Sequence, residues 1–381
     1  MLKFIKLIFN IVLYLVTFPF PRSNKIIIVG GWDGKRFADN SKGLFLYLNQ
    51  NKSVLNLKKI FWYTNDPEIR KQIEQLGYDV LFGINFKSIF WHLRSAVHFI
   101  DQNPHDILGF LSVHAKRINL WHGVPLKNIG IDLIDDYTSG NPFFQKWSSG
   151  GLWIDQYILA TSDFASDLLT HAMDLPKSKS LIASYPRNIE LYQNYPREIN
   201  NNDVLHVYYL PTYRYGDEIN PILKEDLKEI NQKLVDNNVI FHIKPHFASL
   251  SEWEIIDNFS NFIIIDAKED VYESLLTTDL LVTDYSSVFF DFLLTNKPVL
   301  FFPYDLEKYE NQERGFTMSF EEHTPGDKVF NTSDLINKIL SIKNDYSKYI
   351  NDNKRQYTLI NKKMNRYTDS IDFTEILNFM K

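Results

Sequence analysis

Short, continuous runs of β-branched and other apolar residues recur along this chain, separated by amphipathic stretches. The first run, Lys25 to Val29, ends at two glycines. Such a run has no polar face, so it predicts a strand buried on both sides, as in a parallel sheet. Its alternation with segments of helical period predicts βα units and sheets covered by helices on both faces. The expected strands are Lys25–Val29, Ile60–Tyr63, Ala96–Ile100, Ile118–Trp121 and Tyr157–Ala160, then Val204–Leu210, Val239–Ile243, Phe262–Ile265, Leu280–Val282 and Val299–Phe302.

Two series of these units follow one another along the 381 residues, and the segment from Ser184 to Asp203 separates them. Its prolines and clustered asparagines are typical of a linker. The chain is therefore expected to be an α/β protein with two Rossmann-like domains whose parallel sheets face a central cleft. The expected divisions are a membrane-associating segment at 1–23, domains at 24–190 and 200–345, and a helical segment at 346–381 that can pack back on the N-terminal domain.

The N-terminus carries the membrane signal. Phe4 to Phe20 is apolar except for Lys6 and Asn10. As a helix it would be about 25 Å long, slightly less than the roughly 30 Å hydrocarbon core of a bilayer. A shallow or in-plane anchor is therefore expected, with a true span and an ordinary docking helix as alternatives. The flanking cations that can meet anionic lipid are Lys3, Lys6, Arg22 and Lys25.

Composition and missing motifs exclude several classes of function. The net charge of -6 argues against a surface built to wrap nucleic acid. The chain has no cysteine, which excludes disulfides, a thiol nucleophile and cysteine-ligated zinc. No Walker A loop, G-x-G-x-x-G or Asp-x-Asp pair occurs, which disfavours P-loop NTPases, ordinary dinucleotide enzymes and metal-dependent transferases of the Asp-x-Asp kind. Neither a metal nor a cofactor is therefore expected.

Polar clusters directly after the apolar runs are the candidate functional residues, because ligands of open α/β sheets bind at the carboxyl ends of the strands. His122 follows the Ile118 strand and precedes Gly123, where the chain can turn sharply. Histidine suits a general base near neutral pH. The alternative is a histidine that merely hydrogen-bonds a neighbouring carbonyl in a tight turn.

Three more clusters offer groups for an anion. Arg214 follows Pro211 and Thr212, and its guanidinium could hold a diphosphate or form an ion pair. Lys244 and His246 extend the strand that contains His242, for which no role is expected. Thr283, Asp284, Ser286 and Ser287 lead into a helix whose start could bind phosphate or could simply be capped by a serine. Arg314 is a further candidate phosphate clamp.

Together, WHGVPLKNIG from Trp121, PTYR from Pro211, KPH from Lys244 and VTDYSSVFFDF through ERGF resemble the CDP-glycerol glycerophosphotransferase family of teichoic acid and capsule synthesis. A stretch FADNSKGLFLYL from Phe37 is also similar to that family. The resemblance implies a GT-B architecture with the active site between two Rossmann-like domains, at the cytoplasmic face of the membrane. Tyr213 in place of Trp and Lys244 in place of Arg depart from the family pattern, and the chain has the size of the short, primase-like members.

Carried over to this chain, the resemblance implies His122 as the base for the acceptor hydroxyl and His246 as a second catalytic histidine. It places donor phosphates at Thr283, Ser286, Ser287 and Arg314, with Arg214 nearby. Supporting roles are expected for Gly123, Lys127, Thr212, Lys244 and Asp284.

The expected reaction is transfer of glycerol phosphate from CDP-glycerol to a lipid-diphosphate-linked or polymeric glycan, with release of CMP. Three alternatives stay open. The donor could be CDP-ribitol, or the chain could be a GT-B glycosyltransferase that uses a nucleotide sugar. A non-enzymatic membrane scaffold is the third, and it would not need this set of polar residues at strand ends.

Overall fold

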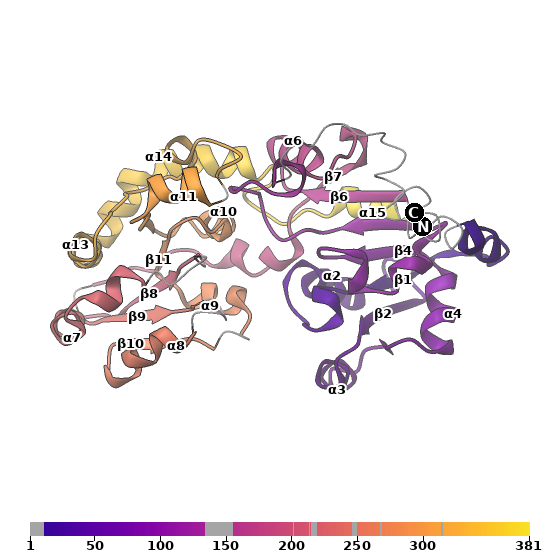
Figure 1. Cartoon of the computed structure of the whole chain (residues 1–381), viewed down its shortest axis with the longest axis horizontal. Coiled ribbons are helices and arrows are strands. Elements are labelled where there is room, and N and C mark those ends of the chain that lie inside the picture. Colours follow the sequence, from indigo (N-terminus) through magenta and orange to yellow (C-terminus); the bar gives the residue numbers. More distant parts are fainter. Residues whose placement is uncertain are drawn as a thin grey trace. The chain divides into compact units, whose positions relative to one another are not determined.

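The structure is a computed structural model that describes residues 11–133, 155–200, 202–212, 214, 219–245, 250–266, 269–313 and 315–381. Contacts divide the chain into two compact units. The first unit contains Met1–His122, Gly130–Ile189 and Ile371–Lys381, and the second contains Gly123–Ile129 and Glu190–Ser370. Figure 1 shows that each unit has its own sheet, flanked by helices.

The sheet of the first unit has seven strands in the order β3-β2-β1-β4-β5-β6-β7. All of its strand pairs are parallel. Because β1 lies between β2 and β4, the chain winds outward in both directions from the first strand, as in a doubly wound fold. The strands are β1 (Ser23–Val29), β2 (Lys59–Thr64), β3 (Val80–Phe82), β4 (Ser95–Ile100), β5 (Lys116–Asn119), β6 (Asp155–Ala160) and β7 (Ser180–Ile182).

Both faces of this sheet are buried, which explains the continuous apolar runs in the sequence. Ile27 and Val29 of β1 pack into a core with α2, α3 and α15. Ile26 and Ile28 face the other way, into a core that includes residues of α4. The helices of this unit are α2 (Asp39–Gln50), α3 (Pro67–Gln75), α4 (Phe86–Arg94), α6 (Asp163–Ala172) and α15 (Thr374–Met380).

The sheet of the second unit has five parallel strands in the order β10-β9-β8-β11-β12. One face packs on α7, α13 and the Trp253 segment. The strands are β8 (Leu205–Leu210), β9 (Val239–Ile243), β10 (Phe262–Ile264), β11 (Leu280–Thr283) and β12 (Val299–Phe301). The helices are α7 (Leu227–Asp236), α8 (Leu250–Trp253), α9 (Val271–Thr277), α10 (Val288–Phe292), α11 (Leu306–Gln312), α12 (Phe320–His323), α13 (Thr332–Asn344) and α14 (Tyr346–Met364).

The expected α/β class and all ten expected strands are confirmed, with ends that differ by a few residues. Helix α7 begins at Leu227, because Asp226 accepts hydrogen bonds from the first free backbone N–H groups and so caps the helix there. Helix α10 has only five residues and is followed by a 3₁₀ turn. Ser287 stands at the N-cap of α10, as the serine-cap alternative predicts, but its side chain makes no capping hydrogen bond.

The end of the N-terminal segment is tied to the first unit by Arg22. Its guanidinium donates to the backbone oxygens of His92, Ser95, Leu111 and Val113. Burial without a carboxylate partner lowers the pKa of Arg22 to about 10. Residues 11–17 are helical. Within the described ranges, no helix is both long and apolar enough to cross a bilayer.

The C-terminus returns to the first unit through α15. The Asp372 backbone oxygen accepts a hydrogen bond from the Ser184 N–H at 2.9 Å, and the Asp372 N–H donates to the Ser184 hydroxyl at 2.9 Å. Ile376 of α15 is fully buried in the core that α2 also joins. Residues that are nearly two hundred positions apart therefore stabilise one sheet.

We expect His92 to make the fold sensitive to mild acid. Its Nδ1–H donates to the Ser88 oxygen and its Nε2 accepts from the Leu108 N–H. Burial lowers the His92 pKa from 6.5 to about 4. As pH falls from 6.5 to 4 the unfolded chain gains a proton that the folded chain resists, so stability is lost by up to about 1.4 kcal/mol per pH unit. His92→Gln should flatten this slope in urea unfolding, whereas the exposed His105→Gln should leave it unchanged.

Candidate active site

His122 lies in the first unit, directly beyond the carboxyl end of β5, in a turn with unusual backbone angles. Trp121 before it has φ 55° and Gly123 after it has φ 134°. A left-handed tryptophan is strained by roughly 1–2 kcal/mol. The Trp121 ring lies 4.1 Å from the imidazole, centroid to centroid. The half-buried imidazole is thus fixed between a strained residue and a glycine.

A second strained turn lies beside His122, after β1. Trp32 has φ 52° and Asp33 has φ 56°. The buried Asp106 carboxylate accepts the Asp33 N–H at 2.8 Å and so fixes this turn. The Trp32 ring centroid lies 6.3 Å from that of His122. His122 therefore has an aromatic ring near it from each of two strand ends.

The second unit holds a buried ion-pair network at the carboxyl ends of β8, β11 and β12. Arg214 donates from Nε and NH2 to the two carboxylate oxygens of Asp305, at 2.6 and 2.9 Å. Its NH2 also donates to Asp284 at 2.9 Å, and NH1 donates to the Thr212 oxygen at 2.6 Å. Asp284 in turn accepts the backbone N–H groups of Thr212 and Tyr285. Arg214 therefore links the segments that follow β8, β11 and β12.

Aromatic rings enclose this network. The Arg214 guanidinium carbon lies 4.8 to 5.2 Å from the ring centroids of Tyr285, Tyr304 and Tyr309. Burial alone would lower the pKa of Arg214, but the charge of Asp284 and the hydrogen bonds of Asp305 outweigh it and raise that pKa above its ordinary value. The guanidinium is therefore held charged against two carboxylates, and only 7% of the residue is exposed.

This arrangement bears on which residues can meet a donor phosphate. Arg214 is already engaged with two carboxylates. Thr283 is fully buried, and its hydroxyl donates to the Leu210 oxygen at 2.9 Å. Ser286 and Ser287 are half-buried, and neither hydroxyl hydrogen-bonds another described residue. Because α10 has only five residues, its dipole adds little. Compared with Arg214 and Thr283, the two serines therefore have the hydroxyl groups that are free of bonds to described residues.

The other predicted residues make separate contacts. Lys244 follows β9; its N–H donates to the backbone oxygen of Tyr209, and its Nζ donates to the backbone oxygen of Asp266. Lys127 forms an isolated antiparallel bridge with Phe316. Asp284 belongs to the Arg214 network described above. His246 and Arg314 lie outside the described residues.

His242 packs against residues of the second sheet. Its ring stacks on Tyr208 at 4.2 Å, and its Nε2 lies 3.0 Å from Nδ1 of His206. Burial, and then the neighbouring His206, lowers the pKa of His242 to about 4. Among the described residues no group of three His, Cys, Asp or Glu side chains could hold a metal ion.

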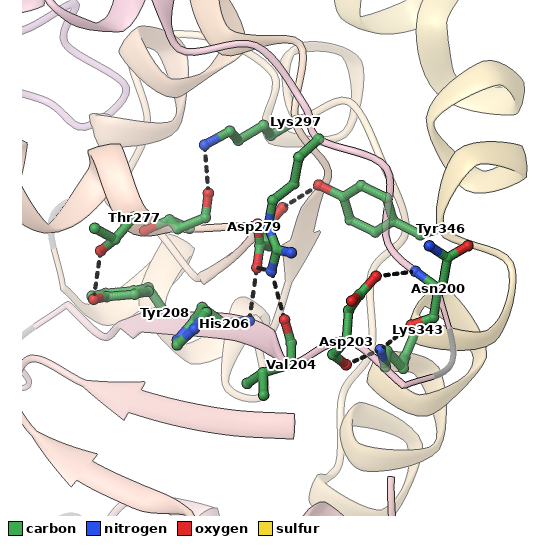
Figure 2. Close-up of polar contacts among 12 residues, drawn as sticks. Asn200, Asp203, Val204, His206, Tyr208, Thr277, Asp279, Lys297, Lys343 and Tyr346 are labelled. Atoms are coloured by element: carbon green, nitrogen blue, oxygen red, sulfur yellow. Dashed lines mark hydrogen bonds and ion pairs between the residues drawn. The ribbon is translucent and has the colours of Figure 1, made fainter. Parts of the chain in front are cut away.

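Another buried polar cluster lies at the opposite edge of the second sheet (Figure 2). Asp279, just before β11, accepts from the Arg197 guanidinium and from the His206 N–H. Lys297 donates to the Thr278 oxygen, and burial lowers its pKa to about 8. Other bonds of the cluster link the segment before β8 to α13, through Lys343, and the Asp279 oxygen to α14, through Tyr346. The cluster therefore stabilises the sheet away from the edge at which ligands bind.

Two residues of the candidate site were not singled out from the sequence. Asp305 lies inside a stretch that carried the family resemblance, FPYDLEKY. Trp32 follows the two glycines that end the first apolar run, and those glycines were the available signal. Gly30 and Gly31 have no room for a side chain, because a Cβ there would clash with Asp106 and Asp101.

The family is decided by a comparison that covers nearly the whole chain. The model of CDP-glycerol:poly(glycerophosphate) glycerophosphotransferases matches residues 12–380. The chain belongs to this family. Within the family, the chain is 28% identical to a teichoic acid glycerol-phosphate transferase of Staphylococcus aureus, over 87% of each chain. It is 27% identical to a teichoic acid poly(glycerol phosphate) polymerase of Bacillus subtilis, over 87% of this chain and 45% of the polymerase.

Solved structures of the family support the fold. The wall teichoic acid polymerase TagF matches with a TM-score of 0.71 at 20% identity, over 99% of this chain and 95% of that one. A histidine-to-asparagine variant of TagF that was soaked with CDPG matches with a TM-score of 0.70 at 19% identity, over the same shares. At these identities the likeness establishes a common fold among family members.

We predict that Asp305→Asn lowers the free energy of unfolding by about 1–3 kcal/mol, because it removes one carboxylate from a buried charged network. Urea denaturation measures the change. Glu229→Gln is the matched control, because its ion pair with Lys233 is exposed and should contribute less than about 0.5 kcal/mol. Equal losses in the two variants would show that the Arg214 network does not stabilise the second unit.

Proposed function

We propose that this chain transfers glycerol phosphate from CDP-glycerol to a hydroxyl of a lipid-linked or polymeric glycan acceptor and releases CMP. The observation that carries the proposal is the family match over residues 12–380. The names of the relatives add to it, since both a glycerol-phosphate transferase and a poly(glycerol phosphate) polymerase align with this chain. The chain spans 87% of the length of the transferase and 45% of the length of the polymerase.

The proposed chemistry uses His122 as the base. The imidazole takes the proton of the acceptor hydroxyl, whose oxygen then attacks the β-phosphorus of CDP-glycerol. A new phosphorus–oxygen bond forms to the acceptor, and the bond from that phosphorus to the bridging oxygen breaks, so CMP leaves with the electron pair. Most of the rate enhancement in such transfers comes from positioning and charge neutralisation. The fixed turn around Trp121 and Gly123 supports this role, because it restricts where the imidazole can point.

The binding site for the CDP-glycerol donor is proposed to lie at the carboxyl ends of the strands in the second sheet. Ser286 and Ser287 supply hydroxyl donors there, and Arg214 holds their turn through Asp284. His246 and Arg314 complete the proposal as the second catalytic histidine and a phosphate clamp, on the family resemblance alone. Two separate parallel sheets also support a GT-B type of fold with two Rossmann-like domains. No metal or cofactor enters the scheme.

We further propose that the chain works at the cytoplasmic face of the membrane and is anchored by its N-terminal segment. Leu15, Val16 and Phe18 support this proposal, because they are 64%, 59% and 74% exposed. An exposed cluster of large apolar side chains is unfavourable in water and fits a lipid surface. A donor supplied from the cytosol would reach the catalytic part on that side of the membrane.

CMP release by the purified protein tests the function. CDP-glycerol, CDP-ribitol and UDP-sugars are each added separately, together with a synthetic lipid-diphosphate disaccharide as the acceptor. The masses of the products are measured by mass spectrometry. Acceptor-dependent CMP release with a mass gain of glycerol phosphate is the expected result. Consumption of CDP-ribitol alone, or of a UDP-sugar alone, would replace the proposal with the corresponding transferase. Failure to bind CMP at all would favour a scaffold.

His122→Ala should lower kcat by about 10²- to 10⁴-fold, the usual contribution of a general base. The loss should appear in kcat at saturating CDP-glycerol, because the histidine is assigned to proton transfer. His105→Ala, at an exposed histidine of the same unit, is the control and should keep wild-type turnover. A folded His122 variant with near-normal kcat would remove His122 from the mechanism.

Replacing Leu15, Val16 and Phe18 with serine should release the protein from anionic phospholipid vesicles in a sedimentation assay, because these side chains provide the apolar contact. The matched control replaces Val54, Ile263 and Leu359, which are also exposed apolar residues, with serine. The control should still sediment with vesicles. Equal binding by both variants and the wild type would place the membrane contact elsewhere or nowhere.

A further inference from the structure

Two buried asparagines hold the backbone on either side of Trp121, the residue before His122. Asn119 accepts the Trp121 N–H on its Oδ1 at 2.9 Å. Asn40 donates from Nδ2 to the Trp121 oxygen at 2.8 Å. Asn40 is fully buried and Asn119 is 2% exposed. Both peptide groups next to Trp121 are therefore fixed by side chains, and the second of these peptides leads directly into His122.

The asparagines are themselves fixed. The Asn40 N–H donates to Asp39 Oδ1 at 2.8 Å, and its Oδ1 accepts the Arg187 N–H at 3.2 Å. Arg187 also pairs with Asp39 at 2.7 Å in a nearly buried ion pair. Asn119 donates from Nδ2 to the Gln102 oxygen at 3.0 Å. Residues from four segments of the first unit thus fix the two peptide groups on either side of Trp121.

Asn40 and Asn119, together called the clamp below, hold Trp121 in a conformation that the chain would otherwise avoid. A tryptophan at φ 55° is strained, and such strain persists only where the surroundings impose it. Asp39, at the start of α2, is also left-handed at φ 64°. Without the asparagines, Trp121 would relax to an ordinary φ, and that rotation would swing the following imidazole away from its present position. The clamp therefore has a consequence at His122 that an ordinary core hydrogen bond lacks.

We propose that Asn40 and Asn119 are positioning residues that hold His122 in the orientation needed for proton transfer. The inference rests on the proposed role of His122 as the base, and it adds two residues that contact neither donor nor acceptor. A displacement of about 1 Å at a reacting group can cost about 100-fold in rate. Removing either asparagine therefore lowers kcat, while the affinity for CDP-glycerol is unchanged.

Kinetics of Asn40→Ala test the proposal. We expect kcat to fall by about 10- to 100-fold, while KM for CDP-glycerol stays at the wild-type value. Asn49→Ala is the matched control, because Asn49 lies on the same helix and its Nδ2 also donates to a backbone oxygen, that of Phe45, at 2.9 Å. That variant should keep wild-type kcat. A wild-type kcat in folded Asn40→Ala, or an equal fall in the control, would overturn the proposal.

Asn119 supplies an independent pair of variants if Asn40→Ala does not fold. The Asn119 side chain accepts a hydrogen bond from the N–H of Trp121, two residues further along the chain. A serine hydroxyl at position 119 can accept the same hydrogen bond. Asn119→Ser should therefore keep much of the wild-type kcat, whereas Asn119→Ala should lose it. Thermal unfolding of each variant shows that the assay temperature lies below its transition. Equal kcat values for the serine and alanine variants would contradict the proposal.

A double-mutant cycle separates this inference from the proposed function. If the asparagines act through His122, Asn40→Ala should cost little more once His122 is already alanine. Additive losses would show that Asn40 acts by another route and would overturn the inference. If His122→Ala alone keeps full activity, the base assignment of the proposed function fails instead, and the wild-type CMP assay still reports whether the transfer occurs.

Discussion

Parallel pairing in both sheets is the constraint on which the candidate site depends. Parallel strands all end at the same edge, so every segment that follows a strand gathers there. In the first sheet this brings Trp32 and His122 together from β1 and β5, although about ninety positions of sequence lie between them. In the second sheet it joins Thr212, Asp284 and Asp305. The opposite edge holds the Asp279 cluster. The topology thus gathers the candidate functional residues at one edge of each sheet, where the Arg214 network also lies.

Buried polar groups in this chain persist because each has specific partners, and the kind of partner decides its role. Arg22 and Arg214 are both largely buried, yet burial lowers the pKa of Arg22 while the carboxylates beside Arg214 raise its pKa. Arg22 satisfies backbone oxygens and secures a chain segment. Arg214 pairs with two carboxylates and fixes a turn, so few of its N–H groups remain to bind a phosphate. Residue type alone therefore does not make a phosphate ligand; a free donor at the site does.

The sequence predicted the strands well because their signal is local. An apolar run such as Lys25–Val29 must be buried whatever its partners are. The polar clusters were also placed correctly at strand ends, with His122 and Asp284 among them. The sequence did not reveal the partners of these side chains. Thr283 and Arg214 have residue types suited to phosphate, but the hydroxyl of one bonds a neighbouring strand and the guanidinium of the other meets carboxylates. Nothing in the spacing of either motif revealed those bonds.

The sequence by itself determined the α/β class, ten strands in their order along the chain, and the family, because apolar periodicity and contiguous motifs are properties of neighbouring residues. It did not reveal the short strands β3 and β7. Only the tertiary structure decided which strands pair and which side chains meet. Arg214 finds its carboxylates 70 and 91 positions away. Asn40 reaches the peptide before His122 across 81 positions. Such contacts depend on how the chain folds back on itself, and local spacing carries no record of that path.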